Sequence, residues 1–256
     1  MKLEGHTVAE RESAVVGVVR AIYRYPVKSM RGEALDEADV AWQGIAGDRG
    51  YAFVQSDDRS TFPYLTAREL PDLLRYTPRL ANTSKPYTSP LLVTTPDGEE
   101  YPIGSEELRA SIAHRYPGPF YLLRLGARAT YDAAPLSLIT TSTVAALGKA
   151  LGMTFDPIRF RPSILVETPD GDPYPEQQWV GRVLAFGAES DSVEMRVSEP
   201  DIRCKMITLD PQTGVAEPRI LAEVVRNIDG ALGVYGLPQK IGRLRVGQNV
   251  HLLASS

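Results

Sequence analysis

The amino-acid sequence predicts a β-rich α+β chain, built from barrel-like sheets and a few helices. Three observations indicate this class. Short runs of β-branched and aromatic residues recur along all 256 residues, 21 glycines and 20 prolines punctuate them, and few stretches carry helix start and stop signals. We expect two regions, residues 14–128 and 129–256, because the pattern changes near residues 124–137.

Most of the chain is expected to form short strands. The first run, AVVGVVRAIYRYPV, is rich in β-branched residues and stops at Pro26. The stretch SPLLVTTPDGEEYPI predicts a hairpin, because Pro96-Asp97-Gly98 separates two apolar runs. The strand-forming stretches, in order, are 14–27, 34–42, 50–58, 89–103, 162–168, 181–187, 192–199 and 242–253.

The helices are expected to be few and short. Each has a capping residue or a proline at its start, which are the usual helix start signals. The expected helices are 65–70 (Thr66 and Glu69, ending before Pro71), 105–116 (Ser105), 142–152 (Ser142, ending at Gly152) and 217–227 (Pro218).

Charge and composition exclude several classes of partner and site. A net charge of −4 and a pI near 5.5 argue against nucleic acid and anionic membranes as partners. No apolar run is long enough to span a membrane and the start lacks a secretory core, so we expect a cytoplasmic protein with a polar tail at residues 1–13. One cysteine excludes an internal disulfide, a four-cysteine iron–sulfur cluster and a cysteine-rich zinc site.

Cys204, the only cysteine, lies in the stretch EPDIRCKMITLDPQTG. A lone cysteine is commonly a small buried hydrophobe, and this interpretation stays open. Arg203 and Lys205 flank the thiol, and nearby cations favour the thiolate, which is a nucleophile or a ligand for a soft metal. Neighbours in a strand point to opposite faces, so the flanking charges alone do not decide between a structural and a chemical role.

Basic and hydroxyl residues follow predicted strands in the first region. Lys28 and Ser29 lie in a loop after the first strand and offer an ammonium and a hydroxyl to an anion. Arg49 lies between two glycines, just before the next strand, and its guanidinium suits a phosphate. A solvated turn and a surface ion pair would explain these residues equally well one at a time.

The second region contributes similar groups. Thr141 and Ser142 lie at a strand-to-helix turn, where free N–H groups bind anions, although simple capping would explain them. Arg159 and Arg161 precede a strand with same-face spacing, so they need anionic partners from a ligand or from protein carboxylates. Together these residues favour a pocket for a phosphorylated or polyanionic small molecule that contains a thiol.

Taken in order along nearly the whole chain, these segments resemble the MOSC family, named for the C-terminal domain of molybdenum-cofactor sulfurase. They are most similar to its two-part members, such as the mitochondrial amidoxime-reducing component and bacterial N-hydroxylated-base reductases. The resemblance implies an N-terminal β-barrel-like MOSC region at 14–128 and a MOSC β-barrel domain at 129–256. The matching segments are YPVKSMRG, GIAGDRGYAFV, LTARELPDLL, PLSLITTSTVAAL, FRPSILVE, the Trp before VGRVLAFG, RCKMITLDPQTG, EPRIL, GVYG and GRLRVGQNVHLL.

The resemblance implies that the chain binds a molybdenum cofactor, a metal held by a pterin dithiolene, with Cys204 as metal ligand and catalytic residue. Pyridoxal phosphate, which would enter only through the sulfurase-type relatives, is not predicted. By match, Lys28, Ser29 and Arg49 hold the pterin phosphate. The other cofactor-binding residues implied are Thr141, Ser142, Arg161, Ser163, Arg203 and Tyr235.

Several positions depart from the family pattern. Ser163 stands where the family has asparagine after Arg-Pro, and Asp201 stands where it often has cysteine in Cys-x-Arg-Cys. The acidic Glu-Asp-x-Trp motif is EQQW here, at 176–179, and the Gly-Asp near the C-terminus is Gly247-Gln248. Asp201 places a carboxylate near the metal ligand, so these departures concern the surroundings of the site rather than the ligand.

The implied activity is the reduction of N-hydroxylated or N-oxide small molecules by a molybdenum-dependent oxidoreductase. The chain has no iron–sulfur cysteines and no dinucleotide-binding turn, so electrons would come from a separate ferredoxin, flavoprotein reductase or haem protein. Two alternatives remain: a sulfur carrier with a persulfide on Cys204 or a molybdenum-cofactor carrier, and a non-redox ligand-binding protein. A Cys-His hydrolase is disfavoured, because none of the three histidines lies beside a nucleophile signature.

Overall fold

The computed structural model describes residues 13–125, 130–169 and 172–254. The predicted polar tail falls outside this part of the chain up to residue 12, and Ser13 begins the first strand. No helix in the described ranges is both long enough and apolar enough to cross a membrane.

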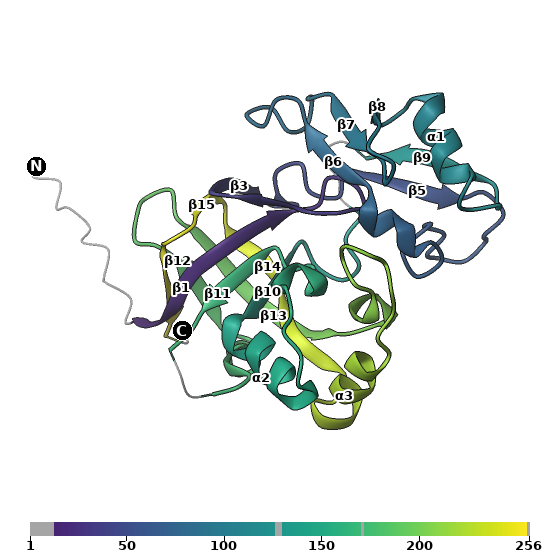
Figure 1. Ribbon diagram of the computed structural model, residues 1–256. Helices are drawn as coiled ribbons and strands as arrows, with labels where there is room; N and C mark the ends of the chain where they lie inside the picture. The colour runs from purple at the N-terminus through teal and green to yellow at the C-terminus, as the bar shows by residue number, and fades with distance from the viewer. Residues whose placement is uncertain (1–12, 126–129, 170–171, 255–256) are drawn as a thin grey trace, which may run out of the picture.

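A closed barrel of seven strands is the centre of the fold (Figure 1). The sheet closes because β1, the first strand of the chain, pairs with both β11 and β16. All the pairs are antiparallel except β10 with β11. In pairing order the strands are β11 (Ile164–Glu167), β10 (Leu136–Thr140), β14 (Ala231–Lys240), β13 (Val193–Ile202), β12 (Val183–Phe186), β16 (Asn249–Leu253) and β1 (Ser13–Arg24).

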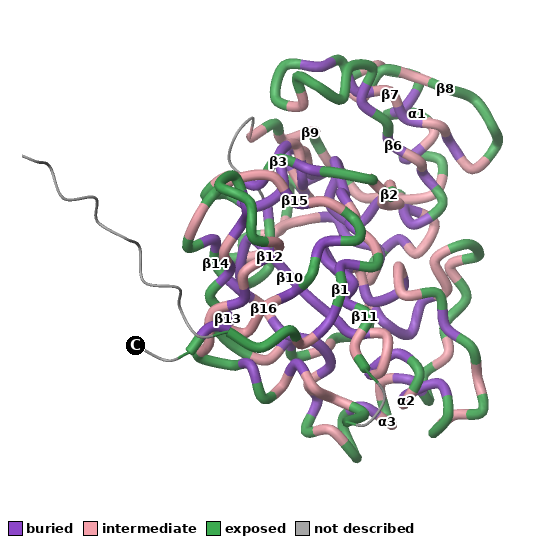
Figure 2. The backbone as a smooth tube through the Cα atoms, turned by 90° about the vertical axis from the view of Figure 1, so that its left-hand side faces the viewer, coloured by how far each residue is buried: buried purple, intermediate pink, exposed green. Residues whose placement is uncertain are grey.

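The interior of the barrel is filled by the inward side chains of these strands. Val193, Met195 and Val197 alternate along β13 and are all fully buried, as the period of two in a strand requires. Phe186 and Trp179 join them in the same apolar cluster. Figure 2 shows buried backbone concentrated in the barrel strands, with exposed segments in the connections.

The first region adds small sheets at one end of the barrel (Figure 1). The elements are β2 (Glu33–Leu35), which pairs with β1; β3 (Glu37–Ala41) and β4 (Gly44–Ile45), with β15 (Gly242–Arg245); β5 (Tyr51–Gln55) with β9 (Phe120–Arg124); β6 (Thr77–Leu80), β7 (Leu91–Thr94) and β8 (Glu100–Pro102); and helices η1 (Pro71–Arg75) and α1 (Glu106–Ala113). The sheets β5–β9 and β6–β7–β8 surround a second core that includes Val27, Phe53, Leu73 and Ile112, whereas the β15–β3–β4 sheet packs on the barrel core.

Two α-helices lie at the opposite end of the molecule from β6, β7 and β8 (Figures 1 and 2). These are α2 (Thr141–Leu151) and α3 (Arg219–Asn227), which pack over a third core containing Leu147, Phe160 and Val224. Three 3₁₀ helices complete the described elements: η2 (Pro157–Phe160), η3 (Pro175–Trp179) and η4 (Lys205–Thr208). The predicted β-rich α+β class with a barrel and few helices is confirmed.

Most predicted elements form, with two corrections. The hairpin around Gly98, the Ser105 cap of α1 and the left-handed Gly152 that ends α2 are all present. The predicted helix at 65–70 is only a turn, although Thr66 hydrogen-bonds to the Glu69 carboxylate as a capping box requires. Since a residue before proline is kept out of the α region, Leu70 is extended and the helix η1 starts only at Pro71.

The cap of α2 is the second correction. Sequence placed the cap at Ser142, but Thr140 caps the helix, because its hydroxyl accepts a hydrogen bond from the Thr143 N–H at 3.2 Å. Glu176, which is fully buried in η3, accepts hydrogen bonds from the hydroxyls of Thr140 (2.8 Å) and Thr143 (2.7 Å). This carboxyl therefore fixes the start of the helix, and burial raises its pKa.

Candidate functional site

A cavity of about 350 Å³ opens beside the end of β13, and residues far apart in the sequence line it. Its walls come from the turns after β1 and β4, the segments 62–68 and 131–135, the connection from η2 to β11, the end of β13, and β14. This volume suits a small molecule. Eight of the ten residues selected from the sequence line it: Lys28, Ser29, Arg49, Arg161, Ser163, Arg203, Cys204 and Tyr235.

Thr141 and Ser142 are not among the residues that line the cavity. They begin α2, and the Ser142 hydroxyl lies 2.7 Å from the Thr168 hydroxyl. Strand β10 separates them from the cavity, which Ser137 lines at the other end of the strand. Four residues of extended chain span roughly 13 Å, so the strand-to-helix turn lies too far from the cavity to line it.

Ser137 and Ser163 are joined by two hydrogen bonds. The Ser163 hydroxyl accepts from the Ser137 N–H at 3.2 Å, and the Ser137 hydroxyl accepts from the Ser163 N–H at 3.1 Å.

The backbone at the cavity is unusual in three places. Ser29, Arg49 and Arg161 have positive φ angles of 65°, 46° and 52°, a conformation that side chains other than glycine rarely adopt. Of the described non-glycine residues, only Asp229 shares this feature. Strained backbone tends to persist where a functional site needs it, so its concentration here supports a binding role for the cavity.

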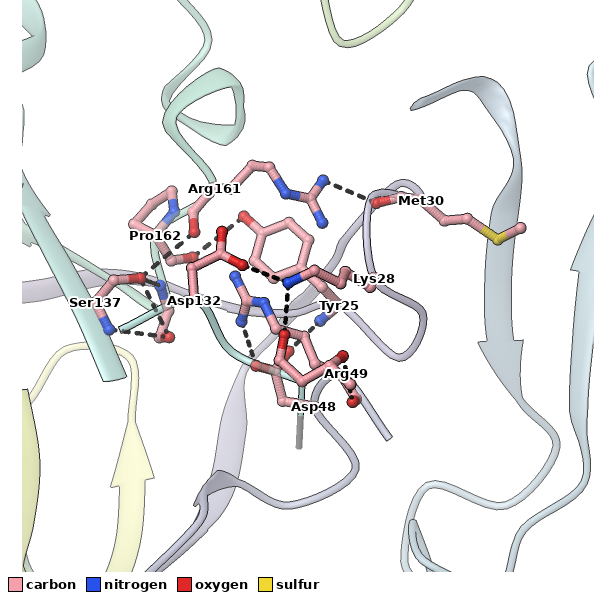
Figure 3. Close-up of polar contacts among 11 residues, drawn as sticks. Tyr25, Lys28, Met30, Asp48, Arg49, Asp132, Ser137, Arg161 and Pro162 are labelled. Atoms are coloured by element: carbon pink, nitrogen blue, oxygen red, sulfur yellow. Dashed lines mark hydrogen bonds and ion pairs between the residues drawn. The ribbon is translucent and has the colours of Figure 1, made fainter. Parts of the chain in front are cut away.

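Tyr25 organises two of the basic groups (Figure 3). The Arg49 and Arg161 guanidiniums lie over its ring, 4.8 and 4.2 Å from the centroid. The ring is fully buried, and its hydroxyl donates to the Pro162 carbonyl at 3.1 Å. Asp48 accepts from the Tyr25 N–H at 2.6 Å and forms an ion pair with Arg49, so both arginines are held in place before any ligand binds.

Arg161 has an unsatisfied donor. Its Nη1 donates to the Met30 carbonyl at 2.8 Å, whereas its buried Nη2 has no hydrogen-bond partner. Burial lowers the pKa of Arg161 to about 10, with the positive charge of Arg49 adding to the effect, so the group is still cationic at neutral pH. A buried donor without a partner is costly, and an anion in the cavity would remove that cost.

Lys28 completes what we call the cationic cluster, Lys28, Arg49 and Arg161. Its ammonium donates to the Thr130 carbonyl at 2.7 Å and forms an ion pair with Asp132. Burial lowers the pKa of Lys28, while Asp132 opposes that change. The Phe62 and Tyr64 rings lie 4.9 and 5.1 Å from Nζ, so aromatic faces flank the cation. A bound anion would compete with the Asp132 carboxylate for Lys28.

The thiol segment, residues 201–204, forms another wall of the cavity. Cys204 is exposed and directly precedes η4. Arg203 turns inward, where its Nε donates to the Leu232 carbonyl at 2.6 Å and its Nη1 to the Phe160 carbonyl at 2.9 Å. Beyond the end of β13 the arginine side chain is thus directed inward while the thiol is accessible, which excludes the interpretation of Cys204 as a buried hydrophobe.

Asp201, one of the departures noted in the sequence, is buried. It is 3% exposed and forms an ion pair with Arg203 at 2.9 Å. Burial raises its pKa to about 6, although Arg203 and a hydrogen bond from Tyr235 both oppose the shift. Burial and the neighbouring Asp201 raise the pKa of Tyr235, which therefore keeps its proton at neutral pH.

The residues after Cys204 form a rigid support for it. Asp210 accepts from the N–H groups of Gln212 (3.0 Å) and Thr213 (2.9 Å) and so closes a turn. Arg159 donates to the Leu209 carbonyl at 2.9 Å and to the Asp210 carboxylate at 2.8 Å. Its partner is thus a protein carboxylate. The prediction that Arg159 and Arg161 lie on one face through strand spacing is wrong. Arg159 lies in the 3₁₀ helix η2, and Arg161 ends that helix with a left-handed backbone conformation.

Three residues of the cavity region were missed from the sequence. Tyr25 and Ser137 lie in segments that carry the family resemblance but were not singled out, and Asp132 lies outside those segments. Long-range packing brings Asp132 and Ser137 to the cavity and Tyr25 under two of its arginines. An aromatic residue between Arg24 and Pro26, at the end of an apolar strand, is the one local signal that was available for Tyr25.

The residues present fit a phosphorylated cofactor that brings most of its own metal ligands. Within the described ranges, no group of three or more His, Cys, Asp or Glu side chains is placed to hold a metal ion. Cys204 offers one soft ligand, so a metal there would take its other ligands from a bound organic group. The cationic cluster and the unpaired Nη2 of Arg161 suit an anionic group such as a phosphate.

Comparison with known sequences identifies the family. The sequence model of the MOSC domain matches residues 126–251, and that of the MOSC N-terminal beta barrel domain matches residues 16–134. The chain belongs to the MOSC family. Its relatives include mitochondrial amidoxime reducing component 2 of Rattus norvegicus, 23% identical over 94% of this chain and 85% of that protein.

A second relative aligns over a shorter length. Mitochondrial amidoxime-reducing component 1 of Danio rerio is 33% identical over 47% of this chain, and the match spans 37% of that protein. Among solved structures, the YUAD protein from Bacillus subtilis has a TM-score of 0.51 at 11% identity, covering 96% of this chain and 100% of that one. At this identity the likeness concerns the fold alone.

Proposed function

We propose that this MOSC protein is a molybdenum-cofactor-dependent oxidoreductase that reduces N-hydroxylated or N-oxide compounds. One observation carries the proposal: an exposed thiol, Cys204, and the buried cationic cluster line one cavity of about 350 Å³. The amidoxime-reducing relatives support the direction of the chemistry, since their names describe reduction of an N-hydroxylated group.

Different residues of the chain would bind different parts of the cofactor. Lys28, Arg49 and Arg161 would bind its phosphate, with the unpaired Arg161 Nη2 as one donor. Ser29 lines the cavity in a left-handed turn next to Lys28, where its hydroxyl is a further donor. The Cys204 sulfur would be the protein's ligand to the metal.

When bound, the cofactor would supply a metal that takes up oxygen and exchanges two electrons. The protein would supply position and protons. Arg203 is anchored to two backbone carbonyls, so it holds the thiol segment in one place against β14. Electrons would come from a separate donor protein, a ferredoxin, a flavoprotein reductase or a haem protein, since the sequence has neither iron–sulfur cysteines nor a dinucleotide turn.

A second candidate function rests on the same thiol. An exposed Cys204 flanked by Arg203 and Lys205 would also suit a persulfide, so a sulfur carrier or a cofactor carrier is the alternative. Turnover separates the two, because a carrier would not reduce an aromatic amidoxime when an artificial electron donor is supplied.

The test is molybdenum per chain, by elemental mass spectrometry, in protein from a host that makes the cofactor. Wild type, Cys204→Ser and Arg161→Gln are compared, with Arg124→Gln as a matched control, because Arg124 stacks on Tyr51 outside the cavity. We expect about one metal per chain in wild type and control, and less in both cavity variants. Amidoxime turnover should be lost in Cys204→Ser.

Three outcomes count against the proposal in different ways. Metal retained in Cys204→Ser would remove the ligand role of the thiol. Metal without turnover would favour a cofactor carrier. Wild-type protein that takes up no metal, even when cofactor is added to it, would contradict the oxidoreductase and leave a persulfide carrier or a non-redox binding protein.

A further inference from the structure

Asp201 is an acidic side chain of the cavity to which the proposed function gives no role. Asp201 lines the cavity three residues before Cys204, is 3% exposed, and points toward Arg203 and Tyr235. It stands where the family often has cysteine, so the family pattern gives it no role. Carboxyl groups buried inside a cavity beside a reactive centre are candidates for proton transfer.

We propose that Asp201 is the proton donor of the reduction, protonating the oxygen that leaves the substrate's nitrogen. The inference rests on the proposed function. For a hydroxylamine-type substrate the balance is R–NH–OH + 2 e⁻ + 2 H⁺ → R–NH₂ + H₂O. The N–O bond breaks, two electrons come from the separate donor protein, and Asp201 gives the proton that completes water. The second proton reaches the nitrogen from solvent, which also reprotonates the carboxylate.

The geometry lets Asp201 change its protonation state without disturbing its surroundings. Arg203 faces it from just beyond the end of β13, but Arg203 also donates to the carbonyls of Leu232 and Phe160, so it is not left unpaired when the carboxyl is neutral. Tyr235, on β14, hydrogen-bonds to the carboxyl and keeps its own proton. On other walls of the cavity, the charge of Asp132 raises the pKa of Asp201 and the charge of Arg49 lowers it.

The other carboxyl groups of the cavity lack this arrangement. Asp132 is paired with Lys28, and that pairing lowers its pKa, so it is ionised at neutral pH. Glu199 is exposed, and among the described residues its carboxylate has no hydrogen-bond or ion-pair partner. Asp201 is therefore the carboxyl whose burial holds its pKa, about 6, close enough to neutral for both forms to be populated.

The experiment measures kcat/KM for an aromatic amidoxime from about pH 5 to about pH 8, with an artificial donor, in molybdenum-loaded protein. Wild-type activity should fall as pH rises through about 6, by up to about tenfold per pH unit. Asp201→Asn should lose about 100-fold or more at the acid end and lose this pH dependence. Its molybdenum content should stay at the wild-type level, because the cofactor contacts are untouched.

Two further variants make the test specific. Glu199→Gln removes the same charge two residues away on the same strand and should keep the wild-type pH profile. Tyr235→Phe removes a hydrogen bond that favours the ionised carboxylate, so the fall in activity should move to higher pH. Tyr235→Phe also tests the proposal if Asp201→Asn does not fold.

A measurement without turnover completes the design. Infrared difference spectra between about pH 5 and about pH 8 should show a protonated carboxyl group that is absent from Asp201→Asn. An unchanged pH profile in Asp201→Asn, or a flat profile in active wild-type protein, would overturn the proton-donor role and leave the proposed function intact. Wild-type protein with neither metal nor turnover would overturn both.

Discussion

Replacing Asp201 by asparagine should make the stability of the protein depend less on pH. The pKa of Asp201 rises from 3.8 in the unfolded chain to about 6 in the folded protein, so folding favours the protonated form. The stabilisation from this group is therefore fully present below the unfolded pKa and is lost as pH rises through about 6. Between about pH 5 and about pH 8 the linkage amounts to about 1.4 kcal/mol.

The assay is urea unfolding of wild type and Asp201→Asn at both pH values. The difference in unfolding free energy, variant minus wild type, should increase by about 1.4 kcal/mol from the acid to the basic value, or about 3–6 °C in Tm. Every other titrating group contributes equally to both proteins and cancels. A difference that stays constant with pH, or that decreases, would show that burial does not raise the pKa of Asp201.

Three further outcomes follow. Arg161→Gln should weaken binding of inorganic phosphate, measured by calorimetry, about tenfold or more, whereas Arg124→Gln should leave it unchanged. Gly233→Ala should lose about 2 kcal/mol in urea unfolding, because φ is +82° and a Cβ would lie 2.7 Å from a carbonyl oxygen; Gly230→Ala, at +79° with open space, should lose less. Asp210→Ala should speed proteolysis within residues 205–214, and equal cleavage rates would contradict its closing role.

The fold class was predictable because its signals are local. Alternating buried residues at Val193, Met195 and Val197, and a turn at Gly98, are visible in any window of a few residues. The helix at 65–70 failed for a local reason as well: a capping box formed, but the residue before Pro71 could not be helical. The closure of the barrel through β1 has no local signal, because the strands that pair with β1 to close it lie more than 100 residues away in the sequence.

The cavity was predictable in its chemistry and less so in its geometry. Basic residues at strand ends indicated an anion site, and most of them converge. Ser142 does not line the cavity, because strand β10 runs away from the cavity before α2 starts. The burial of Asp201 arises from the pairing of β13 with β14, which brings Tyr235 to it, and neither the pairing nor the burial appears in the sequence pattern.

The pairing of β1 with β16 also constrains how the protein is made. Strand β16 follows β1 by more than 200 residues, so the barrel stays open until that whole stretch has been synthesised. Until then the edges of β1 and β12 that pair with β16 are exposed and can pair with other chains. Residues 129–256 expressed alone would lack β1 and would leave the edges of β11 and β16 exposed, so we expect the barrel to need both regions of the chain.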